Sequence, residues 1–76
     1  MKISAEQSEM ISGFVQVTIS FKTDGGGELR PPIKVIVEAK GGSVIVNRVA
    51  YMKARDELPE SEVELRDALT RMINEP

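Results

Sequence analysis

The clearest pattern in the chain is a strict alternation of apolar and polar residues in the stretch GFVQVTISFK. β-Branched and aromatic side chains at every second position are typical of a strand that buries one face. The sequence therefore predicts a strand over residues 13–22, and the same phase continues back to Ile11, so the strand could begin nearer that residue. Its apolar positions are Val15, Val17, Ile19 and Phe21.

A second strand is predicted over residues 33–40, where the alternation returns in IKVIVEAK. Gly41 and Gly42 follow, and glycines readily adopt the positive φ of a two-residue hairpin turn. The next stretch, SVIVNRVAYM, is rich in β-branched residues. We therefore expect a third strand, from residue 43 to about residue 51, that pairs antiparallel with the second.

This third segment has a competing interpretation. Continued alternation would turn Arg48 inward and Tyr51 outward, so a strand would need a bulge there. Asn47 could instead cap a helix through RVAYMKARDEL, whose residues are mostly good helix formers. The strand is the preferred interpretation and the helix remains the alternative, with Pro59 ending either element.

A C-terminal helix is marked by the capping-box pattern of Ser61 and Glu64 and by apolar residues at helical spacing after it. Its predicted buried stripe is Leu65, Ala68, Leu69, Met72 and Ile73.

The first twelve residues are open to two interpretations. Ser4 and Gln7 suit a second capping box, which favours a short N-terminal helix, but a helix of this length is marginal alone and the segment could lack regular structure. The fold class expected for residues 1–76, taken as one small domain, is α+β. It consists of a three-stranded antiparallel sheet (a β-meander) with the C-terminal helix packed on one face.

The stretch FKTDGGGELRPP invites comparison with a phosphate-binding loop. A dinucleotide motif starting at Gly25 would need glycine where Arg30 stands, and Pro31 and Pro32 lack N–H donors. The sequence therefore predicts an ordinary connection between strands.

The chain has no Cys and no His, which removes thiolate nucleophiles, Ser-His relays and ordinary zinc or haem ligation. The cluster of Tyr51, Lys53, Asp56 and Glu57 is what a chain with 29% charged residues produces without selection for catalysis. We expect a protein that is not an enzyme, with no cofactor and no metal.

No apolar run approaches the ~20 residues of a membrane-spanning helix, and residues 1–12 lack the apolar core of a signal peptide. Absence of cysteine fits a reducing compartment. The expected location is the cytoplasm, without a membrane partner.

Charge is unevenly distributed. Residues 20–55 carry seven Lys and Arg against three acids, whereas residues 56–76 carry seven acids against two Arg. A basic sheet face would suit nucleic acid, and an α-β-β-β-α order would resemble that of the double-stranded-RNA-binding domain. The acidic PESEVEL stands where that family has a Lys-rich helix start, so no residue role carries over. The residues of this nucleic-acid alternative are Lys22, Lys34, Lys40 and Lys53.

The preferred function is protein binding, because the predicted outer sheet face carries apolar side chains where a monomer would have polar ones. On the expected hairpin, Ile36 and Ile45 would be diagonal neighbours. The chain is expected to be a stoichiometric regulator or inhibitor that acts through its sheet face or edge on another protein or as a homodimer. Size alone suggests the small proteins that phages and mobile elements encode. The proposed partner-binding residues are Ile36, Ile45, Val49 and Tyr51.

Overall fold

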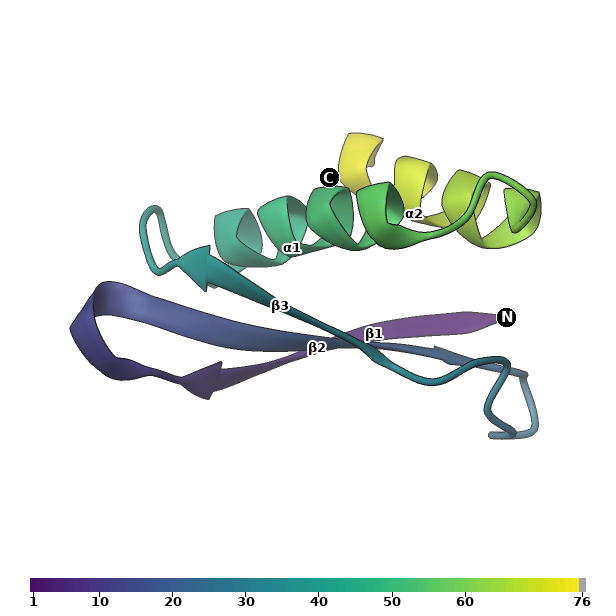
Figure 1. Ribbon diagram of the computed structural model, residues 1–76, viewed down its shortest axis with the longest axis horizontal. Coiled ribbons are helices and arrows are strands. Elements are labelled where there is room, and N and C mark those ends of the chain that lie inside the picture. Colours follow the sequence, from purple (N-terminus) through teal and green to yellow (C-terminus); the bar gives the residue numbers. More distant parts are fainter. Residues whose placement is uncertain (76) are drawn as a thin grey trace.

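A computed structural model describes residues 1–75, which form a three-stranded antiparallel sheet with two helices over one of its faces (Figure 1). Strand order in the sheet is β1-β2-β3, so each strand pairs with its neighbour in the chain. The α+β class and the meander are confirmed, but two of the elements differ from expectation. The elements are β1 (Lys2–Glu9), the 3-10 turn η1 (Ile11–Gly13), β2 (Phe14–Lys22), β3 (Ile33–Glu38), α1 (Ser43–Glu57) and α2 (Val63–Asn74).

Strand β2 forms where the alternation predicts a strand, whereas β3 begins at Ile33 as predicted and ends at Glu38, two residues before the predicted end. Their register places Val17 opposite Val35 and Ile19 opposite Ile33, so the inward side chains of the two strands lie in common rows. All inward positions of both strands are buried beneath the helices, which makes this pair the floor of the hydrophobic core.

The expected third strand over residues 43–51 is wrong, because this segment is the first half of α1. Val46, Ala50 and Ala54 stand four residues apart and are all buried, a spacing that belongs to one face of a helix. A helix also keeps Arg48 exposed, whereas continued alternation would turn it inward. Burial of this stripe outweighs the β propensity of the segment.

The two glycines at 41 and 42 take positive φ angles of 84° and 86°, but they lead into α1 and do not form a hairpin. Gly42 is the N-cap residue of the helix. A Cβ atom at Gly41 would lie 2.7 Å from Cδ1 of Ile45, so the helix start packs directly on this glycine.

The alternative of a short N-terminal helix is also wrong, because Lys2–Glu9 is strand β1. Ile3 and Ala5 face the core opposite Phe21 and Ile19, and they are its only apolar contributions from this strand. Pairing of the backbone with β2 therefore stabilises an element whose side-chain pattern is weak.

Helix α2 is confirmed. Ala68 and Leu69 are buried, and Leu65, Met72 and Ile73 pack against the core as expected. The predicted capping box does not form, since Glu62 is the N-cap residue and makes no side-chain cap bond.

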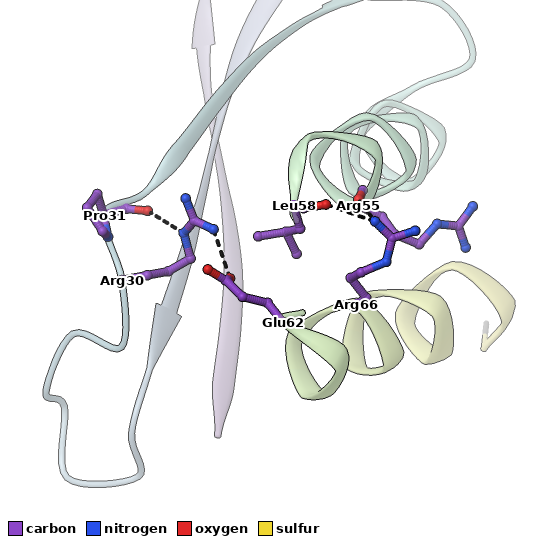
Figure 2. A network of polar contacts seen from close by, with 6 residues as sticks. All are labelled: Arg30, Pro31, Arg55, Leu58, Glu62 and Arg66. Carbon is purple, nitrogen blue, oxygen red and sulfur yellow. Dashed lines mark hydrogen bonds and ion pairs between the residues drawn. The ribbon is translucent and has the colours of Figure 1, made fainter. Parts of the chain in front are cut away.

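Arginine side chains hold the two helices and the β2–β3 connection together (Figure 2). Nη1 of Arg66 donates to the carbonyl oxygens of Arg55 at 3.2 Å and Leu58 at 2.8 Å, which lie at the C-terminal end of α1. On the other side of α2, Nη1 of Arg30 donates to the Glu62 carboxylate at 2.9 Å.

Residues 23–32 connect β2 to β3, as predicted for the glycine-rich stretch. Thr23 organises this connection, because its hydroxyl oxygen accepts from Gly27 N–H at 2.9 Å while its own N–H donates to the Gly27 carbonyl at 2.7 Å.

The entry into α1 can be tested with Gly41→Ala. A residue with a Cβ in the left-handed region costs at least about 1 kcal/mol, and Ile45 must also move, so we expect the free energy of unfolding to fall by at least that amount in urea denaturation. In the control Gly25→Ala the nearest atom lies 4.0 Å away, and we expect a change within about 0.5 kcal/mol. Equal losses in the two variants would contradict this account of the turn.

The helix connection can be tested with Arg66→Met, which keeps the aliphatic stem and removes the donor. Hydrogen bonds from a charged group contribute about 1.5–3 kcal/mol, so we expect the free energy of unfolding to fall within that range. Arg48→Met, at an exposed helical site, is the control and should be nearly neutral. If both variants unfold at the same urea concentration, Arg66 does not stabilise the connection.

Candidate interaction surfaces

The four residues predicted to bind a partner do not form one outer sheet face. Ile36 is 50% exposed on β3, but Ile45 is 49% exposed on the first turn of α1, so their expected diagonal pairing within a sheet is wrong. Val49 is half-buried against the core. Tyr51 was expected to face outward and is instead buried, and this burial raises the pKa of its phenol.

A different group of apolar side chains gathers at one end of the molecule. The η1 turn and the β3–α1 connection both lie at the left end in Figure 1. They are joined there by a hydrogen bond of 2.8 Å from Ala39 N–H to the Gly13 carbonyl. Half of the ten exposed large hydrophobic residues among residues 1–75 lie in these two segments or within three residues of them in the chain. We call this group the apolar end: Met10, Ile11, Phe14, Val44 and Ile45.

The most exposed members of the apolar end were not predicted from the sequence. Ile11 is 89% exposed and Val44 is 76% exposed. Ile11 had been assigned to the inward phase of a strand, but it lies in the turn before β2, where no partner strand covers it. The signal that could have found it is the Ser-Gly pair that follows, which favours a tight turn.

The sheet face opposite the helices is open. Its outward residues are mostly small and polar, with Phe14 and Ile36 at the end nearest η1. The register places Phe14 opposite Glu38 and Gln16 opposite Ile36, so Phe14 and Ile36 are diagonal neighbours and extend the apolar end onto this face.

The four lysines of the nucleic-acid alternative are spread over several surfaces. Lys22 and Lys34 lie on the open sheet face, whereas Lys40 Nζ pairs with the Glu38 carboxylate at 3.4 Å and Lys53 Nζ donates to the Ile36 carbonyl at 2.8 Å. Lys2, which is not one of the four predicted lysines, lies directly opposite Lys22.

The titratable cluster considered in the sequence is divided by the fold. Lys53, Asp56 and Glu57 line a shallow groove beside β3, whereas Tyr51 lines a separate groove between α1 and α2. Within residues 1–75, no group of three or more His, Cys, Asp or Glu side chains is arranged to hold a metal ion. Neither helix of this range has the length and apolar composition needed to cross a bilayer.

A cleft of about 510 Å³ lies between the β2–β3 connection and the start of α2. Four of its charged groups are paired with each other, since Asp24 binds the N-terminal ammonium group at 3.0 Å and Arg30 binds Glu62 at 2.9 Å. The carboxylate of Glu64 also lines the cleft.

Comparison with models of protein families, with curated proteins and with solved structures found no match to the chain. Function must therefore be argued from the surfaces themselves.

Proposed function

We propose that this chain is a non-enzymatic protein-binding module whose apolar end docks into an apolar pocket of another protein. The observation that carries the proposal is the exposure of Ile11 in η1 and Val44 in the first turn of α1, together with the hydrogen bond that joins η1 to the connection leading into α1. Concentrated exposed apolar surface is typical of interfaces, whereas scattered single residues are normal on any protein.

The backbone of the η1 turn in the apolar end is closed by a hydrogen bond, which favours tight binding. Met10 N–H donates to the Phe14 carbonyl at 3.0 Å, and Gly13 has a positive φ of 79° that closes the turn. A surface ordered before it meets a partner loses less conformational entropy on binding.

The chemistry of the surroundings indicates the kind of partner. Glu9 ends β1 just before the η1 turn, and Glu38 lies opposite Phe14 in the sheet. Lys40 and Arg48 lie close in sequence to the start of α1. An apolar centre with charges of both signs around it is typical of protein interfaces. A rigid projection of this kind acts by occupying a site, which is the action of a stoichiometric regulator or inhibitor.

The proposal is tested by replacing the exposed apolar side chains with serine. Ile11→Ser with Val44→Ser should leave the thermal melting nearly unchanged, because both residues are exposed, and should weaken partner binding at least about tenfold. The matched control is Leu29→Ser with Val63→Ser, two exposed apolar residues outside the apolar end.

The wild type, the apolar-end variant and the control variant are each immobilised, and the proteins that each retains from the source lysate are compared. A retained protein is then purified, and its affinity for each of the three is measured by titration. The proposal requires a partner that wild type and control bind equally and that the apolar-end variant loses. Retention of the same proteins at the same affinity by all three would contradict it.

A second candidate function is nucleic-acid binding by the open sheet face. Lys2 and Lys22 lie directly opposite each other, an arrangement that repels within the sheet and that a phosphate between them would relieve. Lys34 lies on the same face, together with hydroxyl and amide groups that can donate hydrogen bonds.

Binding through this face would depend on phosphate neutralisation. The slope of log affinity against log salt should become shallower by about 1.8 in Lys22→Gln with Lys34→Gln, since each phosphate contact contributes about 0.9. Lys40→Gln is the control, because Lys40 already pairs with Glu38. Absence of binding to duplex and single strands at low salt would exclude this function.

A further inference from the structure

In the part of the chain that the structure describes, residues 1–75, no other strand covers one edge of β1, and the hydrogen-bonding pattern identifies the backbone groups at that edge. The Phe14 carbonyl accepts a hydrogen bond from the N–H of Met10, which directly follows β1. The Gly13 carbonyl accepts from the N–H of Ala39, which directly follows β3. Backbone groups of a strand alternate in direction, so even-numbered residues of β2 bond to β1. In the register, even-numbered residues of β1 lie opposite even-numbered residues of β2. The backbone N–H and C=O groups of the odd-numbered residues of β1 therefore point to the uncovered edge. These residues are Ile3, Ala5, Gln7 and Glu9.

The opposite edge of the sheet is protected. On β3 the corresponding outward residues are Lys34, Ile36 and Glu38, and the Ile36 carbonyl already accepts from Lys53 Nζ at 2.8 Å. A lysine over the edge and a short edge strand are both means by which proteins prevent unwanted pairing. Within residues 1–75 no hydrogen bond from another segment reaches the outward backbone groups of β1.

A cleft of about 530 Å³ lies between the first half of β1 and helix α2. Ile3, Ala68 and Met72 provide its apolar lining, and Arg71 and Glu75 provide its charged groups. The free edge of β1 thus has a partly apolar cleft beside it, with a guanidinium group available.

We propose that β1 pairs antiparallel with β1 of a second copy of this chain, about a twofold axis at Ala5. The two sheets then become one continuous six-stranded sheet with all four helices on the same face. Ala5 faces Ala5 of the partner, and Ile3 faces Gln7 of the partner in both directions. These three facing pairs exchange about six backbone hydrogen bonds.

Charge selects this register from its neighbours. With the axis at Ala5, Glu9 of one copy faces Met1 of the other, and Met1 lines the same cleft as Arg71 and Glu75. The proposed register therefore brings the Glu9 carboxylate to this cleft, twice in the dimer, and Arg71 is the group with which it would pair. On the sheet face opposite the helices, Lys2 of each copy becomes a diagonal neighbour of Glu6 of the other copy. An axis at Glu6 would oppose two like charges, and an axis at Ser4 would place the neutral Gln7 near Arg71.

This dimer uses a different surface from the apolar end, so it does not depend on the proposed function. The double variant that carries Ile11→Ser and Val44→Ser is expected to dimerise like the wild type. Failure of partner binding and failure of dimerisation are therefore separate results.

The proposal is tested by sedimentation and by hydrogen exchange on the full chain. Wild type should be dimeric at high concentration, with slow exchange at Ile3, Ala5 and Gln7 N–H that becomes fast on dilution. A wild type that is monomeric at every concentration would overturn the proposal. So would a dimer that protects the N–H groups of Lys34, Ile36 and Glu38 instead.

Ala5→Pro removes the outward N–H of β1 at the axis, once in each copy, and proline is tolerated in an edge strand when its missing N–H faces outward. The dimer dissociation constant should rise about tenfold to a hundredfold. Lys34→Pro, which removes an outward N–H from β3, is the control and should dimerise normally. Unchanged dimerisation of a folded Ala5→Pro protein would overturn the proposal.

Charge reversal gives a test that does not depend on the folding of a proline variant. Glu9→Arg and Arg71→Glu should each weaken the dimer several-fold, and the double variant should recover most of the loss because the two charges are exchanged. A double variant weaker than both single variants would overturn the register.

Discussion

The packing of one stripe of α1 on the sheet determines where the other surfaces of the protein lie. Val46, Ala50 and Ala54 are buried over β2 and β3, and the small alanines allow the helix backbone to approach the strands closely. Since residues 43–57 are committed to this helix, the third strand of the sheet has to come from elsewhere in the chain. It comes from Lys2–Glu9, and β2 becomes the central strand.

Three exposed features follow from this arrangement. The chain turns at Gly41 and Gly42 to start α1 at the same end of the molecule as the η1 turn. Val44 in the first turn of α1 and Ile11 in η1 therefore belong to the same end. The edge of β3 is protected by a lysine of α1, whereas within residues 1–75 no strand covers the outer edge of β1. Apart from the phenol of Tyr51, no polar or charged side chain among residues 1–75 is buried.

The elements with strong side-chain periodicity were predictable from the sequence. β2 and β3 alternate strictly, and α2 has a regular apolar stripe that excludes other interpretations. β1 was not predicted because only Ile3 and Ala5 are apolar and inward. Its backbone pairing with β2 does not require a particular amino-acid composition. A strand was the preferred prediction for residues 43–51 because residues 44–46 are β-branched. Burial of one helical face in the folded protein outweighs this local propensity.

The candidate surfaces were predictable only in part, for the same reason. Ile36 and Ile45 are exposed as expected, but they lie on a strand and a helix because the hairpin that would have joined them does not form. Exposure of Ile11 depends on the chain reversing immediately after β1, which requires knowing that β1 exists. The lysines were expected on one face because a strand was assumed where Lys53 lies on a helix.

Backbone NMR of the full chain tests the central claim most directly, because α1 as a helix and β1 as a strand give contacts that a hairpin through residues 41–42 cannot give. The account predicts sequential amide–amide contacts through residues 43–57 and a cross-strand contact between Ala5 and Ile19. Cross-strand contacts between Val37 and Val46, with no contact from Ala5 to Ile19, would contradict it.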